Sequence, residues 1–268
     1  MSTNQKTSGG FTSLVATIAV ALCLVAGILV YMYVLGNPDN FVGGDVEGEP
    51  KEGNFLGIAH KGGMIVPFLI AMNLIVLVFS IERFVTLAKA GGKGRSDKFV
   101  QDIREKLENN QLAEAIAVCD EQKGSLANVV RAGLVKFESV ASDSSLDKDQ
   151  KVETMKKELE EATALELPML SKNLGILSTS ASISTLIGLI GTVLGMIKAF
   201  AAMAGGAPDP AQLATGISEA LVNTFLGIFA STISIIVYNL FTTKIDGNTY
   251  SMDEASYSIV QSFTAKVK

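Results

Sequence analysis

The sequence has no tryptophan, one histidine and two cysteines among its 268 residues. The histidine, His60, has no second histidine or cysteine nearby, so the ligand set of a zinc site is not assembled. Cys23 lies in an apolar run and Cys119 in a charged one, so the two are not expected to pair. We therefore predict neither a metal site nor a disulfide framework.

The sequence also has no basic face and no enzyme motif. Its 22 Lys and Arg residues are mixed with 27 Asp and Glu residues, which gives a net charge of -5 and no electrostatic footprint for nucleic acid. It has no nucleophile elbow, phosphate loop or paired acid and base. The glycine spacing in GLIGTVLG loosely matches a dinucleotide fingerprint, but no strand precedes it. We therefore predict that the protein is not an enzyme and holds no cofactor.

Long apolar runs dominate what is present. Hydrophobic residues make up 48% of the chain and charged residues only 18%. About 20 apolar residues are enough to cross a bilayer as a helix. The first run, Leu14 to Leu35, is too long for a signal peptide and no small-residue cleavage site follows it, so we expect an uncleaved helix. The prediction is an all-α integral membrane protein with four transmembrane helices and long helices that extend into a cytoplasmic helical domain.

Charge and hydropathy divide the chain into segments. The expected segments are an N-terminal membrane helix with a periplasmic loop (1–62), a second membrane helix (63–88), a cytoplasmic helical region (89–172), a membrane hairpin (173–245) and a cytoplasmic C-terminal tail (246–268). Lys and Arg residues next to the apolar runs place the middle region and both termini in the cytoplasm. A helix that begins near Asp147 is expected to run past Pro168 into the third membrane segment.

The hairpin carries polar residues at matching depths. If its turn centres near Pro208, residues whose numbers sum to about 416 lie at equal depth. That rule pairs Thr192 with Thr224 and Thr185 with Ser231, and it puts Lys198 beside Glu219. On each helix the two hydroxyl residues are seven apart, Thr185 and Thr192 on the first and Thr224 and Ser231 on the second. Residues seven apart differ by only about 20° in direction around an α-helix. The hairpin is therefore predicted to form one wall of a polar path.

Each polar feature of the hairpin also has a structural interpretation. Thr192 and Thr224 could bond to the carbonyl one turn back in their own helices. Glu219 could mark the outer edge of the membrane, or it could be an intramembrane ionisable group, which is usually functional. Small residues, including Gly188, Gly191 and Gly195, form a face for close helix packing.

The stretches GLIGTVLGM and GISEALVNTFLGIFA resemble the MotA/TolQ/ExbB family of proton-channel subunits, and most closely its ExbB and TolQ branch. The likeness covers roughly the last two thirds of the chain. MotA itself has prolines in the corresponding helices, and these are absent here. The family's functional positions fall on Thr192, Glu219 and Thr224. The family pattern has no counterpart of the first apolar run, which we therefore expect to stand apart from the pore.

The resemblance implies a bacterial inner-membrane homopentamer, coupled to protons, that encloses two copies of a single-pass partner of the ExbD or TolR kind. Such a ring would energise a TonB-type transducer for import across the outer membrane. Two alternatives stay open at this point. One is a TolQ-like role in envelope maintenance, and the other is a membrane scaffold that conducts nothing.

Overall fold

The computed structural model describes residues 6–203 and 209–266, with side chains from residue 14 onward. Over these residues the chain is helical, without a β-strand. Four segments are long and apolar enough to cross a membrane: Leu14–Leu35, Gly63–Ala90, Lys148–Ala201 and Pro210–Lys266. The prediction of an all-α chain with four membrane helices is confirmed. The chain forms two compact units, one from residues up to 81 with 175–238, the other from residues 82–174 with 239 onward.

The first unit begins with α1 (Lys6–Leu29), whose C-terminal end widens into a π-helical turn, Val30–Leu35. The amide of Gly36 closes this turn by donating to the carbonyl of Tyr31, five residues back. A loop, the short helix α2 (Phe55–His60) and α3 (Val66–Ala90) follow. Most apolar side chains of α1 are exposed, as expected of a helix that faces lipid.

The end of the first run packs against the rest of the first unit, while its expected place apart from the pore stays a prediction. Leu35 is buried in one cluster with Ala59, Val66 and Val222. Val222 belongs to α9 (Pro210–Lys266), the last helix of the chain. Tyr31 stacks on His60, with ring centroids 4.5 Å apart. The π-helical turn therefore packs against α9, while the rest of α1 remains largely uncovered.

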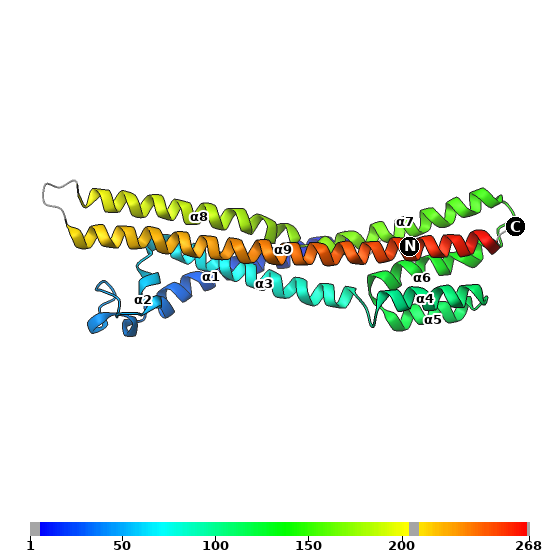
Figure 1. Ribbon diagram of the computed structural model, residues 1–268, viewed down its shortest axis with the longest axis horizontal. Helices are drawn as coiled ribbons and strands as arrows, with labels where there is room; N and C mark the ends of the chain where they lie inside the picture. Colours follow the sequence, from blue (N-terminus) through cyan, green and yellow to red (C-terminus); the bar gives the residue numbers. More distant parts are fainter. Residues whose placement is uncertain (1–5, 204–208, 267–268) are drawn as a thin grey trace. The chain divides into compact units, whose positions relative to one another are not determined.

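α8 (Leu174–Ala201) and α9 run side by side in the first unit as the expected hairpin (Figure 1). The turn predicted at Pro208 lies outside the described residues. Asp209 starts α9, because its carboxylate accepts hydrogen bonds from the amides of Ala211 and Gln212 at the helix N-terminus. α9 continues without interruption through residue 266, so the predicted C-terminal tail is helical where it is described.

The second unit contains α4 (Ser96–Glu108), α5 (Leu112–Gln122), α6 (Gly124–Ala141) and α7 (Lys148–Ser171), together with the C-terminal part of α9. The predicted apolar face of α4 is buried through Phe99, Ile103 and Leu107. Phe137 of α6 meets Phe263 of α9 edge to face. Cys119 is a free, buried thiol, and burial raises its pKa to about 12. It is therefore protonated and unreactive at neutral pH.

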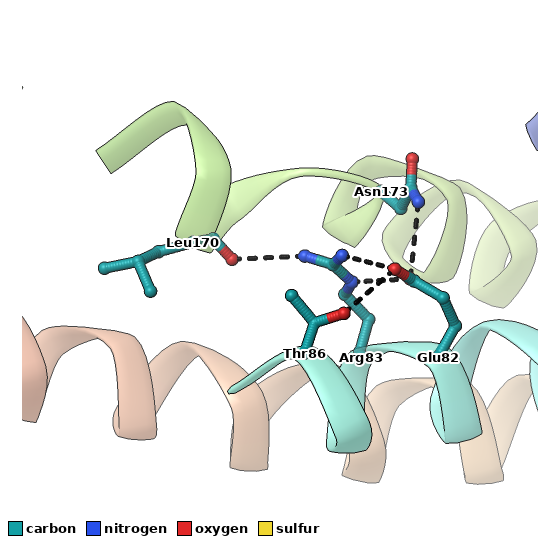
Figure 2. A network of polar contacts seen from close by, with 5 residues as sticks. All are labelled: Glu82, Arg83, Thr86, Leu170 and Asn173. Carbon is teal, nitrogen blue, oxygen red and sulfur yellow. Dashed lines mark hydrogen bonds and ion pairs between the residues drawn. The ribbon is translucent and has the colours of Figure 1, made fainter. Parts of the chain in front are cut away.

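The expectation of one continuous helix from Asp147 into the third membrane segment is wrong. α7 ends at Ser171 and α8 begins at Leu174, and between them Asn173 adopts a left-handed conformation with φ of +60°. Figure 2 shows why the break is stable. Arg83 is almost fully buried and donates to the carbonyl of Leu170, which the end of α7 leaves without a helical partner.

Glu82 completes this network. It accepts two hydrogen bonds from Arg83, at 2.6 and 2.7 Å, and one from the side-chain amide of Asn173 at 3.3 Å. Thr86 donates to the same carboxylate. The network therefore satisfies a buried guanidinium and the end of α7 together, which an uninterrupted helix could not do.

A pair of glycine substitutions tests the contribution of the Asn173 side chain. Asn173→Gly and Asn110→Gly both keep a left-handed backbone, since Asn110 has φ of +57°, but only the first removes a bond to Glu82. A hydrogen bond to a charged group contributes about 1.5–3 kcal/mol. We therefore expect Asn173→Gly to lower the melting temperature of the purified protein by about 3–8 °C more than Asn110→Gly. Equal shifts would mean that the Glu82 contact contributes nothing.

Candidate functional site

Thr192 of α8 and Thr224 of α9 are hydrogen-bonded to each other through their hydroxyl oxygens. The equal-depth pairing is therefore confirmed. Each hydroxyl also lies within bonding distance of the carbonyl four residues back, Gly188 for Thr192 at 3.1 Å and Ala220 for Thr224 at 3.0 Å. Back-bonding and pairing thus occur together, and both side chains remain only partly buried.

The second expected pair is not joined. Thr185 is exposed and donates to the carbonyl of Ala181 at 3.3 Å, whereas Ser231 is buried. Among the described residues no hydrogen bond links Thr185 to Ser231. The next residue along α9, Thr232, is exposed instead. A part for Ser231 in a polar path stays a prediction.

The hydroxyl stripe on α8 is longer than we predicted from the sequence. Ser178 is exposed and lies seven residues before Thr185, as Thr185 lies seven before Thr192. Seven residues are close to two turns of an α-helix, so the three side chains share one face. Extending the same spacing by one step would have found Ser178.

Lys198 and Glu219 form an ion pair, as their equal depth predicted. The Lys198 ammonium donates to both carboxylate oxygens, at 2.7 and 2.8 Å. The side chain of Glu219 is 5% exposed and that of Lys198 is 58% exposed. The carboxylate is therefore enclosed by the chain, while its partner reaches it from the surface.

The hydroxyl pair and the ion pair lie on opposite edges of the contact between α8 and α9. At about 100° per residue, Lys198 lies about 120° around α8 from Thr192, and Glu219 about 140° around α9 from Thr224. Between these two edges, small residues form the contact between the helices. Gly195 approaches the backbone of Gly216 and Ala220 so closely that an added Cβ would lie 2.7 Å from each.

The predicted glycine face packs α8 against α9 within one chain. An added Cβ on Gly188 would lie 3.0 Å from the carbonyl oxygen of Asn223 and 3.1 Å from the Cα of Gly227. On Gly191 it would lie 2.5 to 2.8 Å from the side chain of Asn223. The glycines therefore bring the two backbones close enough for the threonines on one edge to meet.

Two asparagines, Asn223, which is buried, and Asn73, which is partly buried, escaped the sequence prediction. The side chain of Asn223 donates to the carbonyl of Gly62 at 2.9 Å, and its Oδ1 has no hydrogen-bond partner among the described residues. Asn73 donates to the carbonyls of Leu69 and Leu226, at 2.8 and 3.4 Å. Both stand inside long apolar runs, and that position is the signal that could have identified them.

His60, the single histidine, is the last residue of α2. Burial lowers its pKa, Lys61 lowers it further and Glu47 opposes the change. Its backbone carbonyl accepts a hydrogen bond from the Tyr31 hydroxyl at 3.2 Å. The described part of the chain contains no group of three or more His, Cys, Asp or Glu residues placed to hold a metal ion.

Replacing two glycines of α8 separately tests whether Gly191 makes room for Asn223. Gly191→Ala should displace Asn223 and break its bond to Gly62, which costs about 1–3 kcal/mol if a buried group is left unsatisfied. Gly175→Ala is the matched control, because nothing lies within 4 Å of an added Cβ there. Alanine should be neutral or stabilising at Gly175 by about 1 kcal/mol. Thermal unfolding of both purified variants measures the difference, and a stable Gly191→Ala protein would contradict the packing described above.

Comparisons with known proteins match the region of the chain that contains this hairpin. The model of the MotA/TolQ/ExbB proton channel family matches residues 121–254, which is half of the chain. The chain is 27% identical over 188 residues to the Tol-Pal system protein TolQ of Pseudomonas aeruginosa, covering 67% of this chain and 80% of that protein. It is 27% identical over 218 residues to the biopolymer transport protein ExbB of Pseudomonas putida, covering 78% and 66%.

A third relative, the biopolymer transport protein ExbB of Salmonella typhimurium, is 32% identical over 154 residues, or 55% of this chain and 63% of that protein. The matches to both ExbB proteins thus span slightly less than two thirds of those proteins. With four helices able to cross a membrane, the chain is a multi-pass membrane protein. It belongs to the MotA/TolQ/ExbB proton channel family.

Proposed function

We propose that this chain is the ring-forming subunit of an ExbB-like, proton-driven motor in a bacterial inner membrane. The observation that carries the proposal is the bonded pair of Thr192 and Thr224, which is only partly buried in a largely apolar hairpin. A hydroxyl both donates and accepts hydrogen bonds, so it can serve water or a proton carrier in a dry pore. Thr185 extends the same partly open face toward the start of α8.

Among the residues that the structure describes, no free carboxylate lies on this face. Glu219 is buried against Lys198 on the other edge of the hairpin, and Ser231 is buried as well. Glu219 and Ser231 would therefore affect a proton route indirectly, by holding α9 in place, or directly only after a local rearrangement exposes them. We therefore propose that the carboxylate that carries protons belongs to a single-pass membrane partner of the ExbD or TolR type, which the ring surrounds.

The outer surfaces of α8 and α9 support assembly into a ring. Both helices expose large apolar side chains that need lipid or protein around them, among them Leu186, Leu189, Val193, Leu221 and Ile228. We propose a homopentamer with protons as the coupling ion, without a bound cofactor, that drives a TonB-type transducer. Each elementary charge that crosses the membrane would supply about 2.3 kcal/mol per 100 mV.

A TolQ-like role in envelope maintenance is the second candidate. It is favoured by the TolQ relative of Pseudomonas aeruginosa, 80% of which is matched by this chain. The same hydroxyl face, formed by Thr185, Thr192 and Thr224, would serve either motor. Co-purification distinguishes the two, because an ExbB-like ring should capture a TonB-type transducer and a TolQ-like ring should capture components of the Tol system.

The conducting role can be separated from a scaffold role at the hydroxyl pair. Thr192→Val and Thr224→Val keep the side-chain volume and remove the hydroxyl. Loss of a hydrogen bond to a proton carrier costs about 1–3 kcal/mol, so we expect energy-dependent uptake to fall by about 5- to 150-fold while assembly is unchanged. Thr→Ser at either site should retain most of the uptake.

The control for this experiment is Thr179→Val. Thr179 also lies on α8 and back-bonds, to the carbonyl of Gly175 at 2.6 Å, but it has no partner on α9 among the described residues. We expect Thr179→Val to transport normally. Wild-type uptake in both Thr192→Val and Thr224→Val at matched expression would favour the scaffold.

Reporter fusions test the proposed orientation. Because cationic residues cluster after the second membrane segment, a fusion near Gln122 should report the cytoplasm and one near Gly48 the periplasm. A periplasmic signal at Gln122 would reverse the topology and exclude a motor of this kind.

A further inference from the structure

The carboxylate of Glu219 is enclosed by two separate parts of the first unit. On one side lies the ammonium group of Lys198 from α8. On the other lies Gly63, from the turn that precedes α3. A Cβ added to Gly63 would collide with Oε1 of Glu219, and Gly63 has φ of +75°, which side-chain-bearing residues rarely adopt. Only glycine fits this site on both counts.

The adjacent part of α9 is bound to the same turn. One helical turn after Glu219, Asn223 donates to the carbonyl of Gly62. Between them, Val222 is buried in the cluster with Leu35, Ala59 and Val66. A little more than one turn of α9 is therefore seated on the segment that joins α1 to α3.

We propose that Lys198, Glu219 and the Gly62–Gly63 turn form a latch that fixes the outer end of α9 within one chain. A buried carboxylate without a partner is strongly unfavourable, so Glu219 stays in its pocket only while Lys198 neutralises it. The ion pair thus ties α8 to α9, and the glycine turn ties α9 to the N-terminal segment. In this latch Glu219 is a positioning residue, and its carboxylate does not pass protons along the route.

The latch also has a consequence for the hydroxyl face. Asn223 is the neighbour of Thr224 along α9, so fixing the first residue in rotation fixes the second opposite Thr192. The effect of the latch on transport rests on the proposed function. The stability of the latch itself can be measured without any transport.

Charge exchange tests the ion pair. Lys198→Met leaves the buried carboxylate unpaired, and Glu219→Lys buries an ammonium beside that of Lys198, so each should lower the melting temperature of the purified protein by about 4–10 °C. Glu219→Gln should lower it less, because the amide oxygen can still accept a hydrogen bond from Lys198, which is 58% exposed. The exchanged double variant, Lys198→Glu with Glu219→Lys, should recover at least half of that loss. Lys198→Arg, which keeps the charge, should stay close to wild type.

The matched control is the exposed pair Arg104 and Glu108, whose side chains are 58% and 61% exposed. Reversing either charge there should move the melting temperature by less than about 2 °C, since exposed pairs contribute little. Losses at Lys198 or Glu219 no larger than this control would overturn the latch.

Transport by the same variants decides whether Glu219 positions or conducts. Under our proposal the exchanged double variant regains uptake together with stability, because the pair and not the carboxylate at 219 is needed. A double variant that is stable and assembled but transports nothing would overturn the positioning role. If instead the threonine variants transport normally, the proposed function fails, while the stability results still judge the latch.

A second pair of variants tests the glycine turn independently. Gly63→Ala should destabilise the protein and displace Glu219. Gly53→Ala is the control, because Gly53 has nearly the same backbone, with φ of +74°, and nothing within 4 Å of an added Cβ. The difference between the two measures the contact with Glu219 alone. Equal effects would show that only backbone conformation matters and would contradict the latch.

Discussion

The first unit depends on one constraint, which is that a polar group in an apolar environment must find its partner within the protein. Glu219 meets it with Lys198, and the two threonines meet it with each other and with their own backbones. The second unit follows the same rule at Arg83, whose guanidinium is satisfied by Glu82 and by the open end of α7. In the first unit these partners lie on the two helices of the hairpin, and in the second the partner is the end of a helix.

Close packing by small residues allows the hairpin to carry two kinds of polar contact. Because α8 and α9 meet over glycine and alanine, side chains on either edge of their contact are near enough to bond across it. One edge holds neutral hydroxyls that remain partly open, and the other holds a buried charge. The two edges are therefore suited to different tasks, one to contact with a mobile species and the other to holding the helices in place.

Much of this arrangement could be predicted from the sequence, because it follows from helix geometry. Apolar run lengths indicated the four membrane helices, and an antiparallel hairpin with a known turn places residues at equal depth, which brought Thr192 to Thr224 and Lys198 to Glu219. The rule gives depth and not direction, so it could not show that Ser231 is buried. The break at Asn173 and the bond from Asn223 to Gly62 depend on partners far away in the sequence, and a local pattern contains no record of them.

The π-helical turn at Val30–Leu35 has a consequence for the helical register of this segment. A π turn holds one residue more than an α turn in the same rise, so it absorbs a single inserted residue locally. Upstream of it, α1 keeps its contact through Gly27 with Pro67 and Ala71. Downstream, Leu35 reaches its buried cluster. The extra residue of the turn thus offsets the register of α1 from that of the loop that follows, so that Gly27 and Leu35 can both keep their contacts.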